Sequence, residues 1–364
     1  MQHSNSGSSF RILYFYTQDA TFIRKDLEML RSRHRVCEMG FAAREKWKTP
    51  LLFFLQILFI LQQGAFSKKN IIMVQFAGYH SFVPCLWAKI FGLKSIIIVG
   101  GTDCVSFPSL GYGHFHKKML ARFTRWSYQL CNVVSAVHES LFYREDHYYL
   151  EKESKQGILH FFPKARFRKN VIFNGFDTEL FRIINPWDSR REGSYLSISA
   201  SLTDSVRMKL KGIDMVLELA ATMPEASFTL IGSSGNVPEK LPANVQLLPY
   251  VPNKELPKLY NQHRYYLQLS ISEGFPNALC EAMACGCIPI VSAVASMPEI
   301  TGQSGGIAQK RNLKEILEAA EDAKKKSFTP DWAESVSKRV TENYSWEKRQ
   351  KGLLHLIEEI AESS

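Results

Sequence analysis

Short apolar runs alternate with amphipathic segments through the first half of the chain. The apolar runs predict strands at residues 10–16, 71–76, 95–99, 131–137 and 171–173. Between them, apolar positions at helical spacing predict helices at residues 22–30, 82–91 and 116–130. Strands that alternate with helices in this way favour a parallel, doubly wound sheet.

The alternation starts again after residues 186–193, a polar segment that is rich in breakers and reads as a linker. Strands are predicted at 195–199, 227–231, 245–248 and 265–269, helices at 212–221 and 254–261, and a long loop at 202–210. A chain of 364 residues is long for one domain. We therefore expect an α/β fold of two Rossmann-like, doubly wound parallel-sheet domains that face a cleft.

The most informative segment covers residues 272–286, with the sequence SEGFPNALCEAMACG. Glu273 precedes a Gly-Phe-Pro-Asn turn, and Glu281 follows eight positions later in a short apolar run that ends at Gly286. This pattern predicts a loop, a helix with Glu281 about one turn inside it, and then a buried strand. Free amides at a helix start attract phosphate, and a nearby carboxylate can accept hydrogen bonds from sugar hydroxyls. The segment indicates a nucleotide-sugar site.

This segment resembles the Glu-x7-Glu signature of the retaining, GT-B-fold glycosyltransferases of the group 1 family, which use nucleotide-activated sugars. The resemblance implies that Glu273 contacts the donor sugar and that Glu281 contacts the nucleotide ribose. It also implies that the turn between them holds the diphosphate through its backbone, at Gly274, Phe275, Pro276, Asn277 and Ala278.

Two further phrases resemble the same family. Asn174-Gly175-Phe176-Asp177 is similar to the phrase that closes the first domain, and Tyr344-Ser345-Trp346-Glu347 precedes an amphipathic segment like the terminal helix that crosses back. The resemblance covers nearly all of residues 171–362 and is weaker before them. It implies an acceptor domain at 10–180, a nucleotide-sugar donor domain at 194–343, and a crossing-back helix at 344–364 that packs on the first domain.

Transfer from a nucleotide sugar needs positive groups that stabilise the departing diphosphate. Lys211, followed by Gly212, is similar to the Lys-Gly pair of the family, but the family's Gly-Arg is absent. We expect Arg207, four positions before Lys211, to take the arginine's role, because a guanidinium fits phosphate in a bidentate way. Lys209 is the alternative.

Other candidates follow predicted strands. Gly232 can bring the backbone close to the donor, and Val251 stands where family members line the nucleobase. In the first half, Asp103 follows the strand at 95–99 and is a candidate acceptor-positioning residue or base. Further candidates there are His114, His116 and His138, while residues 17–22 replace the family's early Gly-Gly loop. The chain has no Asp-x-Asp, so we expect no metal clamp on the diphosphate and no cofactor.

The formal charge of +10 is unevenly distributed. Residues 1–185 contain 25 Lys and Arg against 13 Asp and Glu, whereas the rest contain 20 against 22. The basic half is expected to face an anionic membrane surface or a phosphorylated acceptor. No helix-turn-helix, zinc-finger or RNP motif occurs, so no nucleic-acid partner is expected. A solvated basic surface without a partner is the alternative.

The longest apolar run, at residues 51–61, would reach about 16 Å as a helix, against roughly 30 Å of bilayer hydrocarbon. It predicts a buried helix; a helix in the membrane interface beside Lys46, Lys48, Lys68 and Lys69 is the alternative. Seven scattered cysteines without metal-ligand spacing, and a polar start, indicate a cytoplasmic protein, with peripheral association at the inner face of the membrane as a further alternative.

Together these features predict a retaining, metal-independent glycosyltransferase. It would move a sugar from a nucleotide-sugar donor to a saccharide or lipid-linked acceptor, in cell-envelope or polysaccharide biosynthesis. Two alternatives stay open at this point. One is a nucleotide-sugar epimerase of the same fold, and the other is a non-catalytic basic module that binds a membrane or nucleic acid.

Overall fold

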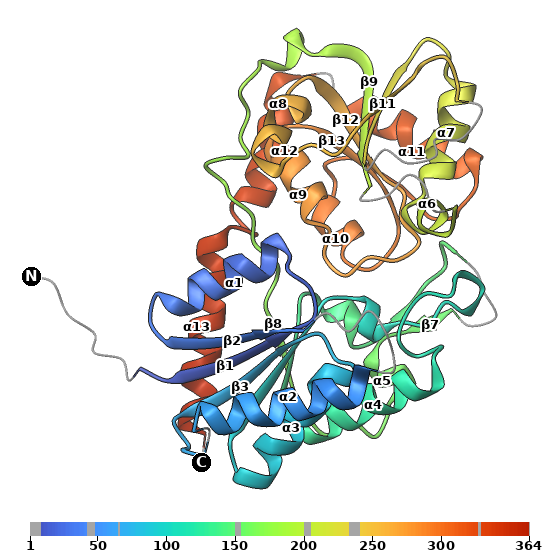
Figure 1. Cartoon of the computed structure of the whole chain (residues 1–364). Helices are drawn as coiled ribbons and strands as arrows, with labels where there is room; N and C mark the ends of the chain where they lie inside the picture. Colours follow the sequence, from blue (N-terminus) through green and yellow to red (C-terminus); the bar gives the residue numbers. More distant parts are fainter. Residues whose placement is uncertain are drawn as a thin grey trace, which may run out of the picture. The chain divides into compact units, whose positions relative to one another are not determined.

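The computed structural model describes residues 9–41, 48–64, 66–149, 154–199, 205–232, 241–326 and 329–363. The chain divides into two compact units (Figure 1). The first unit consists of Met1–Tyr143, Gly157–Phe173 and Arg349–Ser364, and the second of Arg144–Gln156 and Asn174–Lys348. Each unit is built on its own parallel sheet.

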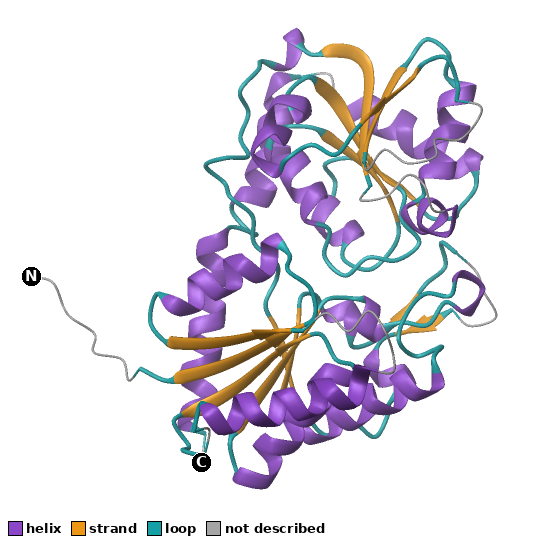
Figure 2. Cartoon of the chain, in the orientation of Figure 1, coloured by secondary structure: helices purple, strands orange, loops and turns teal. Residues whose placement is uncertain are grey.

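The first unit contains a six-stranded parallel sheet with the strand order β2-β1-β3-β4-β5-β8. Its inner strands are long apolar runs because helices cover both faces, with α1 on one side and α2, α3 and α4 on the other (Figures 1 and 2). The strands are β1 (Arg11–Tyr16), β2 (Arg35–Gly40), β3 (Asn70–Gln75), β4 (Lys94–Val99), β5 (Val133–Ala136) and β8 (Arg168–Val171). The helices are α1 (Thr21–Arg31), α2 (Thr49–Gln62), α3 (Tyr79–Phe91), α4 (Lys118–Leu130), α5 (Ile158–Phe161) and α13 (Trp346–Glu362), which reaches this unit from Arg349 onward.

The second unit contains another six-stranded parallel sheet, with the order β11-β10-β9-β12-β13-β14. The strands are β9 (Arg191–Ile198), β10 (Ser227–Ile231), β11 (Val245–Leu248), β12 (His263–Gln268), β13 (Ile288–Ser292) and β14 (Gly306–Ala308). The helices are α6 (Ser205–Lys211), α7 (Ile213–Thr222), α8 (Leu256–Tyr260), α9 (Asn277–Ala284), α10 (Met297–Thr301), α11 (Leu313–Lys326) and α12 (Pro330–Thr341). A short antiparallel pair, β6 (Arg144–Glu145) and β7 (Lys155–Gln156), completes the strands of the described residues.

The strand orders locate the places where ligands bind in such sheets. Counted along the chain, the second sheet has the order 3-2-1-4-5-6 of a dinucleotide-binding fold, and its order reverses between β9 and β12. The first sheet reverses between β1 and β3. Loops at the carboxyl ends of these strand pairs diverge and leave a crevice. The predicted fold class of two doubly wound parallel sheets is confirmed.

Several local predictions are wrong. Part of the expected loop at 202–210 is the helix α6, and the expected strand at 171–173 lies earlier, as β8. The expected linker at 186–193 runs into β9, because the buried Arg190 donates hydrogen bonds to Cys285 O at 2.7 Å and Asn261 Oδ1 at 3.2 Å. These elements are set by contacts with distant residues rather than by local apolar spacing.

The apolar run at 51–61 does form a helix, α2, but the prediction that it is buried is wrong. Leu52, Gln56 and Ile60 face the protein, whereas five other apolar side chains are exposed. They are Leu51, Phe54, Ile57, Leu58 and Leu61. In the part of the chain that the structure describes, neither α2 nor any other helix has the length and apolar content needed to span a bilayer.

Candidate functional site

A glycine at the end of α6 positions the first candidate residue. Gly212 has a φ of +71°, and a Cβ there would lie 2.0 Å from Leu269 O, just beyond β12. The backbone of this turn therefore packs directly against the end of β12, and Ile271 N donates to Leu210 O at 2.8 Å. This close approach brings Lys211 beside the loop that carries Glu273.

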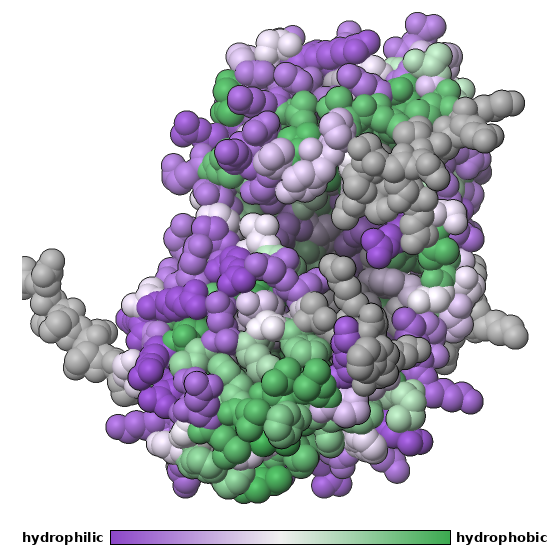
Figure 3. Space-filling view, in the orientation of Figure 1, coloured by the Kyte–Doolittle hydropathy of each residue, from purple (hydrophilic) through white to green (hydrophobic). Residues whose placement is uncertain are grey.

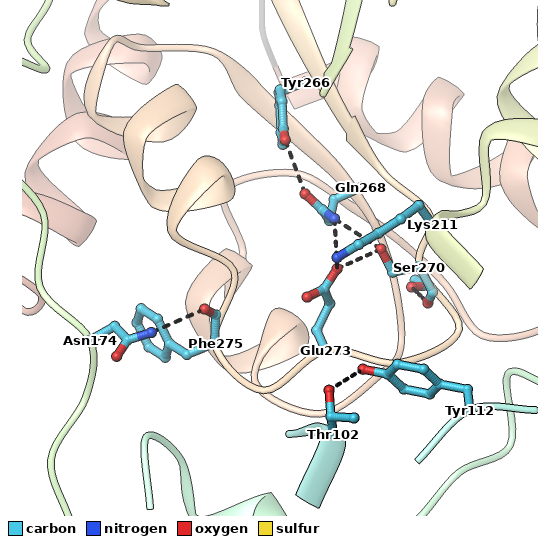
Figure 4. Close-up of polar contacts among 10 residues, drawn as sticks. Thr102, Tyr112, Asn174, Lys211, Tyr266, Gln268, Ser270, Glu273 and Phe275 are labelled. Carbon is cyan, nitrogen blue, oxygen red and sulfur yellow. Dashed lines mark hydrogen bonds and ion pairs between the residues drawn. The ribbon is translucent and has the colours of Figure 1, made fainter. Parts of the chain in front are cut away.

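Lys211 and Glu273 form an ion pair within a hydrogen-bond network (Figure 4). Glu273 Oε1 accepts from Lys211 Nζ at 2.6 Å, from Ser270 Oγ at 2.8 Å and from Gln268 Nε2 at 3.0 Å. The Lys211 side chain is 34% exposed and that of Glu273 is 11% exposed. Among the described residues, only Oε1 of this carboxylate is engaged. Oε2 is thus available to accept a hydrogen bond from a sugar hydroxyl.

Two contacts with distant residues position the turn between Glu273 and α9. Asn174 Nδ2 donates to Phe275 O at 3.4 Å, and the Phe275 ring packs on Tyr344 with 5.0 Å between ring centroids. Within the described residues, the amides of Gly274, Asn277 and Ala278 donate to no protein acceptor. The buried Ser272 Oγ and Asn277 Oδ1 also lack a described partner. This cluster of unused donors and acceptors at a helix start suits a phosphorylated ligand.

Glu281 lies inside α9 and is almost completely buried. Burial raises the pKa of its carboxyl to about 7, although long hydrogen bonds from Asn253 Nδ2 at 3.3 Å and Tyr260 OH at 3.4 Å act in the opposite direction. The carboxyl therefore changes its charge close to neutral pH. A ligand hydroxyl that donates to it would favour the ionised form.

The two candidate cations before Lys211 have different surroundings. The helix α6 places Arg207 one turn before Lys211, on the same side of the helix, and its side chain is exposed. Lys209 points elsewhere, with its Nζ 5.5 Å from the centre of the Tyr149 ring. The helical geometry favours Arg207 over Lys209 as the companion of Lys211.

Gly232 and Val251 follow neighbouring strands of the second sheet. Gly232 is buried directly after β10, and its amide donates to Leu248 O at 3.1 Å. This amide therefore extends the hydrogen bonding between β10 and β11. Val251 is half-buried after β11, and the preceding Tyr250 is 73% exposed. The rest of the glycine-rich loop, residues 233–240, lies outside the described residues. No described contact joins Gly232 or Val251 to the Lys211–Glu273 pair.

In the first unit, Asp103 is completely buried and accepts hydrogen bonds from the loops around it. Its Oδ2 accepts from Ala77 N at 2.9 Å, and its Oδ1 from the amides of Gly101 and Gly100 at 3.3 and 3.4 Å. Burial raises the pKa of this carboxyl, whereas these amide hydrogen bonds lower it. Because both oxygens are engaged, the geometry supports a positioning role for Asp103 and not that of a base.

Asp103 and the loops to which it is hydrogen-bonded line a cavity of about 590 Å³. Thr17 and Gln18, after β1, and Phe76 and Gly78, after β3, lie on it, so the cavity is at the point where the strand order reverses. Phe76 has a φ of +64°, and its ring occupies the space beside Gly100, where a Cβ would lie 2.3 Å from it. The other lining residues are Phe41, Leu52, Tyr79, His80, Thr102, His114 and Leu120, and Thr102 Oγ1 lies 2.9 Å from Tyr112 OH (Figure 4).

Two histidines of this cavity are kept neutral by burial. Burial lowers the pKa of both His80 and His114 to about 4. His80 Nε2 lies 2.8 Å from Gln75 O, whereas the buried Nδ1 atoms of His114 and His116 have no partner among the described residues. His138 is bonded instead within its own turn, with Nδ1 2.8 Å from Ser140 Oγ. Of the predicted histidines, His114 is the one that lines the cavity.

Sequence reasoning missed Gln268 and Ser270, which hold Glu273, and it missed His80. The signal for the first two was polar side chains at the carboxyl end of an apolar strand, β12. Among the described residues, no cluster of three or more His, Cys, Asp and Glu side chains could hold a metal ion.

Residues 202–325 match the family of the glycosyl transferases group 1. The chain is 32% identical over 110 residues to O-antigen chain mannosyltransferase B of Escherichia coli, covering 28% of this chain and 27% of that protein. It is 28% identical over 151 residues to a component of the phosphatidylinositol N-acetylglucosaminyltransferase of Homo sapiens, covering 37% of this chain and 31% of that protein. The chain spans less than a third of the length of these curated relatives.

Solved structures resemble nearly the whole chain. Sucrose-phosphate synthase from Thermosynechococcus elongatus has a TM-score of 0.71 at 15% identity and covers 98% of this chain and 100% of its own. The catalytic domain of starch synthase IV from Arabidopsis thaliana, bound to ADP and acarbose, has a TM-score of 0.69 at 14% identity, with 97% and 100% covered. The chain thus has the GT-B fold, and its residues 202–325 resemble the glycosyl transferases group 1 family.

Proposed function

We propose that this protein is a retaining glycosyltransferase. It moves a sugar from a nucleotide-diphosphate sugar to a saccharide or lipid-linked acceptor, in the synthesis of a cell-envelope glycan or polysaccharide. The observation that carries the proposal is the Lys211–Glu273 ion pair, 2.6 Å long, beside the unused amides that precede α9. The functions of the curated relatives, a mannosyltransferase and an N-acetylglucosaminyltransferase, support it.

On the donor side, the diphosphate binds at the amides of Gly274, Asn277 and Ala278. Lys211 and Arg207 stabilise the negative charge that grows on the diphosphate as it leaves, through charge-assisted hydrogen bonds. Glu273 orients the Lys211 ammonium with Oε1 and accepts from a hydroxyl of the transferred sugar with Oε2. With two cations and a helix start at the phosphates, the step needs no metal ion.

Glu281 binds the ribose of the donor. Its carboxyl is buried, and its hydrogen bonds to Asn253 and Tyr260 are long, which leaves acceptor capacity for ribose hydroxyls. A nucleotide that brings two hydroxyl donors compensates the cost of burying this charge. The site therefore discriminates against an analogue that lacks those hydroxyls, because such an analogue leaves the buried carboxylate with its two long hydrogen bonds alone.

On the acceptor side, the first-unit cavity holds the attacking hydroxyl. A neutral imidazole is a hydrogen-bond acceptor at the nitrogen that carries no proton. His114 Nδ1 has this character, because the pKa of the ring is about 4 and the atom has no described partner. It would accept the hydrogen bond of the acceptor hydroxyl, while Asp103 fixes the loops around it. Retention requires that this hydroxyl approach the sugar from the face that the diphosphate leaves.

The test is nucleotide binding, measured as the shift in melting temperature with UDP, GDP, ADP, CMP and their common sugars in the presence of a metal chelator. One nucleotide should raise the melting temperature in a dose-dependent way. Lys211→Ala should abolish the shift, and Lys314→Ala, a change at an exposed lysine of α11, should preserve it. If no nucleotide shifts the folded protein, a non-catalytic basic module becomes the better explanation.

The bound donor then identifies the reaction. Incubation with a saccharide or glycolipid acceptor should give a product whose anomeric configuration, measured by NMR, equals that of the donor. If the donor alone yields an isomerised nucleotide sugar at the same rate, the protein is an epimerase and the proposed transfer is wrong.

A further inference from the structure

The helix α2 is apolar on its outward side as well as on its inward side, unlike a helix on a soluble surface. Its central polar residue, Gln56, is buried and donates to His80 O at 2.7 Å. Five apolar side chains of the same helix face outward, and Phe54, at 57% exposed, is the most accessible. Helices that cover a core normally bury their leucines and expose their glutamines. This arrangement indicates that the outward side of α2 contacts something apolar.

Neighbouring helices extend the apolar surface of α2. Phe53 of α2 and Phe82 of α3 both pack against Phe123 of α4, with ring centroids 5.7 and 5.2 Å apart, so the three helices form one aromatic layer. Figure 3 shows hydrophobic side chains gathered over the area that α2 and α3 occupy in Figure 1. We call this surface the α2–α4 face. Its exposed apolar residues outside α2 are Phe66, Ile90, Phe91, Met119 and Trp126.

The helices of the α2–α4 face carry charges of one sign. Between residues 48 and 138 the sequence has one acidic residue, Asp103, and that side chain is completely buried. The same stretch has nine basic residues, and those of α4 alternate with its exposed Met119 and Trp126. They are Lys48, Lys68, Lys69, Lys89, Lys94, Lys117, Lys118, Arg122 and Arg125. An apolar surface whose helices carry cations and no acidic residue matches the interface of an anionic bilayer.

We propose that the α2–α4 face docks on a bilayer of anionic phospholipid, with α2 lying in the interface plane. A helix of 14 residues is about 21 Å long, too short to cross roughly 30 Å of hydrocarbon, so α2 lies along the membrane and does not span it. Trp126 is suited to the boundary between headgroups and acyl chains. The basic residues around the face contact the lipid phosphates.

Charge argues for lipid over a second copy of this chain. A two-fold dimer through the α2–α4 face would bring the same basic residues from both copies together, and α2, α3 and α4 themselves carry no acidic residue to pair with them. Like charges across an interface cost affinity. Anionic headgroups provide the opposite charge, and acyl chains provide the apolar surface.

The docked face contains the rim of the first-unit cavity. Leu52 of α2, Tyr79 of α3 and Leu120 of α4 all line this cavity, and each stands in the first turn or two of its helix. Leu51 and Met119, which are exposed, stand next to these lining positions, and the exposed Phe54 is two positions from Leu52. If the proposed transferase function holds, the acceptor is a membrane-resident glycolipid, whose sugar enters the cavity while its lipid chains remain in the bilayer.

The experiment is co-sedimentation of the whole protein with vesicles of phosphatidylcholine alone or of phosphatidylcholine mixed with phosphatidylglycerol. The protein should sediment with the mixed vesicles and remain largely in solution with the neutral ones, and added salt should weaken the binding. The double variant Phe54→Asp, Leu58→Asp should bind about tenfold or more weakly, and Lys118→Glu with Arg122→Glu should lose the preference for the anionic lipid. Ile184→Asp and Lys314→Glu, at exposed positions of the second unit, are the matched controls and should bind like the parent.

Three results would overturn the proposal: binding that ignores lipid charge in the parent, binding unchanged in both face variants, or a dimer in solution that Phe54→Asp, Leu58→Asp dissociates. The melting temperature, measured without vesicles, verifies that each variant is folded, and the nucleotide-induced shift in it reports donor binding. It also separates the two proposals. A protein that binds vesicles but no nucleotide would leave the docking intact and contradict the transferase function, and the reverse would contradict only the docking.

Discussion

Asp26 and Arg349 form a buried, bidentate ion pair, although 323 positions separate them in the sequence. Both hydrogen bonds are 2.6 Å long, and neither side chain is appreciably exposed. Arg349 also donates to Phe173 O at 2.9 Å. The pair therefore fastens the part of α13 that belongs to the first unit to α1 and to the end of the segment that follows β8.

Removal of one partner should leave an uncompensated buried charge. We expect Arg349→Met to destabilise the protein by about 3–5 kcal/mol, because the completely buried Asp26 carboxylate loses its partner. Urea-induced unfolding, followed by circular dichroism, measures the change. Arg33→Met breaks an exposed pair with Glu358 and should cost less than about 1 kcal/mol. Equal effects of the two substitutions would refute the importance of burial here.

Glu281→Gln should stabilise the protein in alkaline solution. The folded-state pKa of about 7 lies above the ordinary value of 4.5, so ionisation of Glu281 disfavours folding as the pH rises through this range. At pH 8 the neutral glutamine should gain up to about 3 kcal/mol relative to the parent, and at pH 4.5 the gain should vanish. Melting curves at both pH values test this. A gain that does not change with pH would contradict it.

The same residue should make nucleotide binding depend on pH. If the ionised Glu281 accepts from the ribose, binding favours loss of its proton, and the affinity should rise as the pH increases from 6 to 8, by up to about tenfold per pH unit below the pKa of about 7. Titration calorimetry with the donor nucleotide measures this slope. In Glu281→Gln the affinity should be lower and should no longer change with pH. A parent protein with a flat profile would exclude ribose binding by the carboxylate.

Gly212→Ala should disturb the donor site through the backbone. The added Cβ would lie 2.0 Å from Leu269 O, so the turn before α7 must move and take Lys211 with it. Gly193→Ala is a matched control, because Gly193 also has a positive φ, +58°, but its nearest neighbouring atom is 3.7 Å away. Both variants carry backbone strain of roughly 1 kcal/mol. Only Gly212→Ala should lose nucleotide binding, which the melting-temperature shift reports.

His114→Gln should separate acceptor from donor chemistry. We expect transfer to fall by about tenfold or more, while the nucleotide-induced shift in melting temperature remains. Because the pKa of His114 is about 4, the ring is neutral from about pH 5 upward and should add no inflection to the rate profile between pH 5 and 8. His355→Gln, at an exposed position of α13, is the control. Unchanged transfer would remove His114 from the acceptor site.

The fold was largely predictable because parallel sheets that are buried on both faces leave long apolar runs. The buried strand β10 coincides with its predicted range for that reason. The edge strand β2 was not predicted, because its residues are only half-buried and alternate with charges. The helix α6 was also missed, since it is short and its position depends on the contact of Leu210 with Ile271.

Some features of the candidate site could likewise be predicted from the sequence, and others could not. The segment around Glu273 and Glu281 could be recognised because a local phrase encodes the loop and the helix start together. The network of Gln268 and Ser270, the burial that raises the pKa of Glu281, and the cavity beside His114 arise from residues that are distant in sequence. For Asp103, the strand before it was visible, but the three amides that occupy its carboxylate were not.

The division of the chain has a consequence for how the protein is made. The second unit is complete once Lys348 has been synthesised, whereas the first unit includes Arg349–Ser364. During translation the first unit therefore lacks the partner of its Asp26 carboxylate until α13 has been synthesised. The first unit is therefore completed after the second, and until then it lacks the buried contact between α13 and α1.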